Sequence, residues 1–153
     1  MGIQYIKCYK GKLIYLDNDR HSFLYYNLRG VIMLIRYKNQ EKIAMGLLSF
    51  MPVEKDVKML QKTMKEYETN PDWHLLLWKE EEDIVGAIGI RVEDDLHVVI
   101  QHVSVNPSYR NIGIGNKMVA AVLKQYGEKY DVCADEVVQA FYDKCTNDNL
   151  DED

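Results

Sequence analysis

The sequence has few cysteines and no long apolar segment, and each shortage excludes a class of protein. Its three cysteines, Cys8, Cys133 and Cys145, are too few and too unevenly spaced for a disulfide framework or a zinc site. No apolar run approaches the ~18 residues that a membrane span needs. The first residues also lack the ordered pattern of a signal peptide. We therefore expect a cytoplasmic protein that has no metal site and does not act in a membrane.

Acidic residues outnumber basic ones. The 19 Lys and Arg against 24 Asp and Glu give a formal net charge of −5. An acidic domain is a poor partner for nucleic acid, because phosphate affinity needs clustered Lys and Arg. The length of 153 residues suffices for one domain with a core of its own, but not for two. We therefore expect a single domain that binds neither nucleic acid nor membrane.

Residues 1–32 differ in character from the rest of the chain. They contain five of the eleven tyrosines and show little periodicity, and they carry five Lys or Arg and two Asp. Met33 then opens a clear strand pattern, and codons for Arg29-Gly30 would place a purine-rich ribosome-binding sequence just before its ATG. We interpret residues 1–32 as an N-terminal extension and hypothesise that it is translated leader, with the native protein starting at Met33. A genuine extension or an extra strand pair is the alternative.

The remainder of the sequence predicts a mixed α/β domain over residues 33–145, followed by an acidic tail over residues 146–153. Periodicity and turn signals place the elements in the order β-α-α-β-β-β-α-β-α. The expected strands cover residues 33–38, 73–79, 84–92, 96–105 and 129–134, and the expected helices cover residues 40–51, 56–67, 116–126 and 136–144.

The most informative segment runs from Val103 to Gly115. It joins a β-branched run, a proline and the pattern R-x-x-G-x-G, which leads into a helix. Backbone N–H groups at a helix start, unobstructed because glycines lack side chains, form a seat for phosphate. A dinucleotide-binding fingerprint needs a glycine where Arg110 stands, and a P-loop needs a G-K-[ST] that is absent. The segment therefore predicts a cosubstrate that carries a pyrophosphate.

With the signature V-x-V-x-P-x-x-R-x-x-G-x-G at residues 103–115, after β-α-α-β-β elements, the chain resembles the GCN5-related N-acetyltransferase (GNAT) superfamily. Residues 33–38, 41–52 and 77–80 carry a closer likeness to the small RibT-type members encoded beside riboflavin-biosynthesis genes. The resemblance implies an acyl-CoA N-acyltransferase fold with a mixed sheet. The final strand pair of that fold is shortened or absent here, which leaves room for completion by a second subunit in a homodimer.

What the resemblance implies is acetyl transfer from acetyl-CoA to an amine, with a small molecule as the expected acceptor. The loop before the helix would hold the pyrophosphate, and the backbone of the preceding strand would pair with the pantetheine arm as an added strand does. The cofactor-binding residues implied in this way are Val103, Ser104, Val105, Arg110, Asn111, Ile112, Gly113, Ile114, Gly115 and Asn116.

The catalytic groups follow less directly from the residues. Gln101 stands where family members often carry a glutamate, and an amide cannot act as a base. The nearby titratable group is His102, which we name as the candidate base against the alternative of a histidine satisfied within the sheet. By resemblance, Tyr142 on the last helix is the candidate acid for the coenzyme sulfur. For Cys133 and Cys145 we expect buried packing and not nucleophilic catalysis.

Two other functions stay open from the sequence. The missing glutamate and the missing strands would suit a catalytically silent coenzyme-A-binding module with a regulatory role. A protein-lysine or N-terminal acetyltransferase would need an open acidic groove for its substrate.

Overall fold

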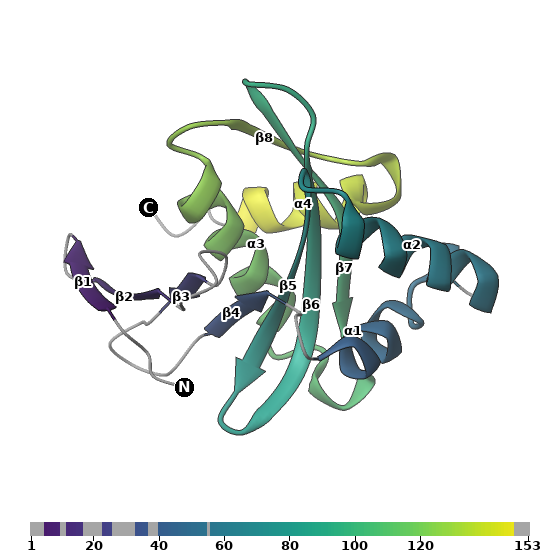
Figure 1. Cartoon of the computed structure of the whole chain (residues 1–153). Coiled ribbons are helices and arrows are strands. Elements are labelled where there is room, and N and C mark those ends of the chain that lie inside the picture. The colour runs from purple at the N-terminus through teal and green to yellow at the C-terminus, as the bar shows by residue number, and fades with distance from the viewer. Residues whose placement is uncertain are drawn as a thin grey trace.

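The protein, seen in a computed structural model, forms one five-stranded sheet with helices around it and a second, three-stranded sheet (Figure 1). The structure describes residues 5–9, 12–16, 23–25, 33–36, 40–54 and 56–148, with side chains described from residue 40 onward. The strands are β1 (Tyr5–Tyr9), β2 (Lys12–Leu16), β3 (Phe23–Tyr25), β4 (Met33–Arg36), β5 (Trp73–Glu80), β6 (Asp83–Val92), β7 (His97–Val105) and β8 (Asp131–Ala134). The helices are α1 (Glu41–Leu48), α2 (Val57–Thr69), α3 (Ile114–Tyr126) and α4 (Glu136–Asp148), with short 3₁₀ turns η1 (Pro52–Glu54) and η2 (Pro107–Tyr109).

The order from β4 to α4 is β-α-α-β-β-β-α-β-α, so the predicted mixed α/β architecture is confirmed. Two ends differ from the prediction. The last helix continues through Asp148, three residues into the segment expected to be a tail. Within residues 5–25 the structure has three antiparallel strands, β1 to β3, where the sequence offered an extra strand pair as an alternative. The other residues of the predicted 1–32 extension, and residues 149–153 of the tail, lie outside the described ones.

The five-stranded sheet has the order β4-β5-β6-β7-β8, antiparallel except for the parallel pair β7 and β8. Its centre is apolar on both faces, because the run Leu75–Trp78 of β5 is fully buried. Cross-strand partners share a face, and α1 and α2 cover one face while α3 covers the other. Ser104 of β7 donates to the Leu47 carbonyl of α1 on the first face, whereas Gly86 of β6 meets Met118 of α3 on the second.

Two irregularities of β7 determine where a ligand could lie. First, Gly89 pairs with His102 but Ile90 pairs with Ile100, so Gln101 is an extra residue in a β-bulge. Second, the parallel pairing with β8 ends at Ile100, because Asp135 leaves the sheet to begin α4. Residues 102–105 of β7 therefore pair with β6 on one side, and residues 101–105 pair with none of the described strands on the other.

The fold predicts opposite effects for two glycine substitutions. An added Cβ at Gly89 would collide with the Tyr67 hydroxyl and lie 3.1 Å from His102 Nδ1. Overpacking of this kind costs about 1–3 kcal/mol, so we expect Gly89→Ala to lower the free energy of unfolding by that amount in a denaturant titration. The matched control is Gly46→Ala in α1, where nothing lies within 4 Å of the added carbon. Because alanine is the better helix former by about 1 kcal/mol, this control should be neutral or stabilising, and equal losses would contradict the packing described.

Candidate active site

The backbone of the loop between β7 and α3 directs several N–H groups toward the same space. Asn106 caps η2 by accepting the Ser108 N–H at 2.9 Å, and the chain then passes through Asn111 (φ 64°) and Gly113 (φ 84°), both left-handed. Gly113 is the N-cap of α3 and offers no side chain to its N–H groups. The first backbone N–H to bond within the helix is that of Lys117, to the Gly113 carbonyl at 3.0 Å. The preceding N–H groups of α3 are therefore available to an anion.

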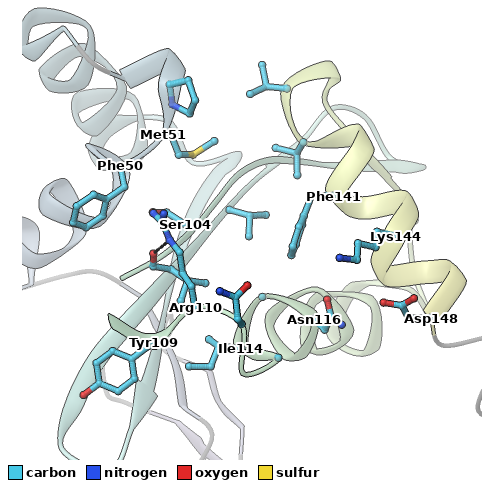
Figure 2. Close-up of a pocket in the computed structure, with 18 residues that line it drawn as sticks. Phe50, Met51, Ser104, Tyr109, Arg110, Ile114, Asn116, Phe141, Lys144 and Asp148 are labelled. Atoms are coloured by element: carbon cyan, nitrogen blue, oxygen red, sulfur yellow. Dashed lines mark hydrogen bonds between the residues drawn. The ribbon is translucent and has the colours of Figure 1, made fainter. Parts of the chain in front are cut away.

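Gly115 lets α4 approach this loop closely. A Cβ on Gly115 would lie 2.5 Å from Cζ of Phe141, so the aromatic ring rests directly on the helix start. Figure 2 shows the Phe141 ring extending from α4 into the space between α4 and β7. Gly115, the second glycine of the motif, is therefore required by packing. Gly113, the first, is required by its left-handed backbone conformation.

A cavity of about 680 Å³ opens between the free edge of β7, the start of α3, the bend before η1 and the inner face of α4 (Figure 2). Nine of the ten residues predicted to bind a cosubstrate line it; Ile112 does not, and its side chain is 62% exposed. Nine residues of the sequence pattern thus form one continuous surface of the cavity. The nine are Val103, Ser104, Val105, Arg110, Asn111, Gly113, Ile114, Gly115 and Asn116.

The remaining walls come from segments whose part in the cavity the sequence indicated weakly or not at all. The Phe50–Pro52 bend lies opposite α4. Helix α4 contributes Val137, Val138, Phe141, Lys144 and Asp148. Arg110 extends back across the mouth, where its Nε donates to the Val105 carbonyl at 3.0 Å and its guanidinium lies 5.8 Å from the Phe50 ring centre.

Tyr142, the candidate acid, does not reach the cavity. Its hydroxyl donates to the Val132 carbonyl of β8 at 3.0 Å, and burial raises its pKa. The phase of α4 turns Phe141 and Lys144 toward the cavity and Tyr142 toward the sheet, which the resemblance-based assignment missed. In this structure the hydroxyl proton is engaged away from the space where a cosubstrate sulfur would lie.

His102, the candidate base, is buried with both ring nitrogens engaged. Nδ1 lies 2.5 Å from the Tyr67 hydroxyl and Nε2 lies 3.2 Å from Oε1 of Glu54. Burial lowers the pKa of His102, against the opposing effect of the Glu54 carboxylate. His102 is therefore the satisfied histidine that the sequence left as the alternative. Glu54, a carboxylate only 6% exposed, was not singled out from the sequence.

Neither of the two cysteines whose side chains the structure describes is an activated nucleophile. Cys145 is buried as expected, its thiol donates to Oδ1 of Asn116 at 2.9 Å, and burial raises its pKa. Cys133 is exposed in β8, which corrects the expectation of burial, and its pKa is also raised, chiefly by desolvation. Neither thiol is activated.

Two other kinds of site are absent from the described residues. Within the described ranges, no group of three or more His, Cys, Asp or Glu side chains is arranged to hold a metal ion. In the same part of the chain, no helix is both long enough and apolar enough to cross a membrane.

The placement of Tyr142 makes a prediction for its hydroxyl. Tyr142→Phe removes only the hydrogen bond to the Val132 carbonyl, so we expect a loss of about 1 kcal/mol in the free energy of unfolding, measured by denaturant titration. The ligand affinity of the cavity should not change. Weaker ligand binding without a loss of stability would place the hydroxyl in the cavity instead.

Sequence comparisons point to one family. The sequence profile of the acetyltransferase (GNAT) family matches residues 47–146. A relative described as an uncharacterised N-acetyltransferase from the 3′ region of lysA in Bacillus methanolicus is 58% identical over 114 residues, which cover 74% of this chain and 94% of that protein.

Solved structures share the fold. Glucosamine-6-phosphate N-acetyltransferase from Arabidopsis thaliana matches with a TM-score of 0.55 at 18% identity, over 75% of this chain and 88% of that one. An aminoglycoside N-acetyltransferase in complex with coenzyme A matches with a TM-score of 0.56 at 14% identity, over 74% and 81%.

Proposed function

The chain belongs to the acetyltransferase (GNAT) family and is an N-acetyltransferase with acetyl-CoA as its cosubstrate, and from this premise we propose that it acetylates an amine of a small molecule by direct attack on the thioester. The observation that carries the proposal is the cavity in which the free edge of β7 meets the N-terminus of α3. Acetyl-CoA, when bound, supplies the activated acetyl group.

The loop residues Arg110 to Asn116 would hold the pyrophosphate. The free N–H groups at the start of α3 suit its negative charge, since the positive end of the helix dipole lies there. Gly113 provides the left-handed turn that aims these groups, and Lys144 adds a cation from the opposite wall. The residues present therefore fit a pyrophosphate-bearing ligand.

The backbone of Val103, Ser104 and Val105 would bind the pantetheine arm. A free strand edge pairs with an extended chain of amides through main-chain hydrogen bonds. A backbone N–H near Val103 would then polarise the thioester carbonyl as a small oxyanion hole. The bulge at Gln101 supports this assignment, because it turns the strand at the point where the thioester would lie.

The proposed acceptor is a small molecule that carries an amine group. The likeness to RibT-type proteins points to an amine of the riboflavin pathway, and the structural neighbours named for aminoglycosides and glucosamine 6-phosphate suggest amino sugars. Both are small molecules. This choice rests on analogy, whereas the binding of the cosubstrate rests on the geometry of the cavity.

The function is tested by thiol release from acetyl-CoA across a panel of amines. The panel contains a pyrimidine diamine of riboflavin synthesis, glucosamine 6-phosphate, sisomicin and a lysine-containing peptide. We expect turnover of at least one small molecule and none of the peptide. Calorimetric binding of acetyl-CoA without turnover of any amine would contradict the proposal, and preferred turnover of the peptide would replace the small molecule with a protein.

The cation on α4 gives a prediction for affinity. We expect Lys144→Ala to weaken acetyl-CoA binding about tenfold, the equivalent of one lost charge-assisted contact of roughly 1.4 kcal/mol, and to reduce the salt dependence of binding. Isothermal calorimetry at two salt concentrations measures both. The matched control is Lys129→Ala, because Lys129 lies 4.9 Å from the Tyr130 ring centre and outside the cavity. Equal affinities for the two variants would remove Lys144 from the site.

A further inference from the structure

Six side chains form a chain of hydrogen bonds that runs from the end of β8 to η1. The bulge makes this possible, since it lets the adjacent residues Gln101 and His102 both approach Tyr67 of α2. The links are Arg91 Nη1 to Asp135 Oδ2 at 2.8 Å, Arg91 Nη1 to Gln101 Oε1 at 3.1 Å, Gln101 Nε2 to Tyr67 Oη at 2.9 Å, Tyr67 Oη to His102 Nδ1 at 2.5 Å, and His102 Nε2 to Glu54 Oε1 at 3.2 Å.

The direction of every link follows from the first. Arg91 can only donate, so Gln101 accepts with its carbonyl oxygen and turns its NH₂ group toward Tyr67. The Tyr67 hydroxyl accepts from Gln101 and has one hydrogen left, which it donates to His102 Nδ1. Burial raises the pKa of Tyr67, so this hydrogen stays in place. The histidine proton must then be on Nε2, which donates to Glu54.

This polarity makes His102 a donor and leaves Glu54 as the final acceptor. Oε1 of Glu54 accepts from His102 and also from the Thr63 hydroxyl at 2.9 Å. Oε2 is buried and has no hydrogen-bond partner among the described residues. An unsatisfied buried oxygen of this kind is costly, and an ordered water, an ion or a catalytic role would account for it.

The position of Glu54 favours the catalytic role. It ends the turn that begins at Pro52, and Met51 and Pro52 line the cavity. Ser104, which also lines the cavity, lies on the same face of β7 as His102. Figure 2 shows Met51 and Ser104 on the side of the cavity away from α4. Glu54 itself does not line the cavity, but its chain neighbours Met51 and Pro52 do, and its partner His102 precedes the strand edge assigned to the thioester.

We propose that an acceptor that reaches past the Met51–Pro52 wall gives its ammonium proton to Oε2 of Glu54, which is closed off from the cavity in this structure. Glu54 is then the general base, and His102 and Tyr67 are positioning residues. This inference rests on the proposed function. It replaces His102 as the base and gives Gln101 a role, because a glutamate at that position would have no hydrogen to give Tyr67.

The proposed step moves two protons from nitrogen and breaks the thioester bond. One N–H bond of the ammonium breaks and an O–H bond forms at Oε2. The lone pair left on nitrogen attacks the thioester carbonyl carbon, the C–S bond breaks with its electron pair on sulfur, and the second proton lost by nitrogen passes to the thiolate. Glu54 then releases its proton to solvent. Besides Glu54, the charged groups of the array are Arg91 and Asp135 at its other end, where Arg91 also pairs with Glu93 at 3.1 Å.

The first test needs no acceptor. Nitrogen-15 NMR of the histidine-labelled full chain should show His102 as the neutral tautomer with its proton on Nε2, unchanged as the pH falls through about 6.5, where a free histidine is half protonated. Tyr67→Phe should release this preference, because it removes the donor to Nδ1. A proton on Nδ1 in the wild type, or titration of His102 near its ordinary pKa, would overturn the proposal.

The second test separates a base from a structural residue by its pH profile. With the panel amine of highest kcat/KM as the probe, Glu54→Gln should lower kcat/KM about 100-fold or more at pH 7, as expected for loss of a general base. The deficit should shrink as the pH rises toward the pKa of the amine, about 10.4 for an alkylamine such as lysine, because the free amine needs no base. A deficit that is constant with pH would show a structural role and overturn the proposal.

The control is Asp56→Asn, the same acid-to-amide change two residues away. Asp56 caps α2 by accepting the Lys58 N–H at 2.8 Å, and asparagine caps equally well, so its kcat/KM should match the wild type. Acetyl-CoA binding by calorimetry should be equal in all three proteins. If acetyl-CoA binds but no panel amine reacts, the proposed function fails, and the NMR test still decides the polarity of the array.

Discussion

The separation of β7 from β8 after Ile100 is the constraint on which the rest of the site depends. A strand that lies in the middle of the sheet at Ile100 becomes an edge at residues 101–105, so its amides can bind a ligand instead of a neighbour. The separation arises because Asp135 begins a helix: its carboxylate is held by the Arg91 guanidinium, which lowers its pKa, and its N–H still donates to the Ile100 carbonyl at 2.8 Å. Helix α4 then forms the opposite wall of the cavity.

The same few residues connect this opening to the buried array. The bulge at Gln101 lies one residue beyond the last β8 pair, and it brings two consecutive side chains to Tyr67. Arg91 holds Asp135 with one nitrogen and orients Gln101 with the same one. The guanidinium of Arg91 thus holds the residue that precedes α4, where β7 and β8 separate. It also sets the direction of the hydrogen bonds in the array.

Local patterns predicted much of this molecule. The element order followed from periodicity, and the loop proposed to bind phosphate was found from two glycines and a proline, because each depends on neighbouring residues only. The site beyond the loop was harder to predict. The resemblance assigned Tyr142 to the cosubstrate, whereas the structure turns Phe141 toward the cavity, since a helical residue turns about 100° from its neighbour. Glu54 has no local signal at all: it is an acidic residue in an ordinary-looking turn, and its burial arises from tertiary packing, in which Thr63 of α2 and His102 of β7 contact its carboxylate.

The sequence by itself therefore determined the family, the fold and the class of cosubstrate, since these depend on a contiguous motif and on short-range periodicity. Tertiary structure alone decided which groups can move protons. His102 became a donor and Glu54 an acceptor because residues 10 to 48 positions apart were brought within 3.2 Å of one another in a place that excludes water. Hydrogen-bond direction in such an array is a property of the whole set of partners, and no single position in the chain encodes it.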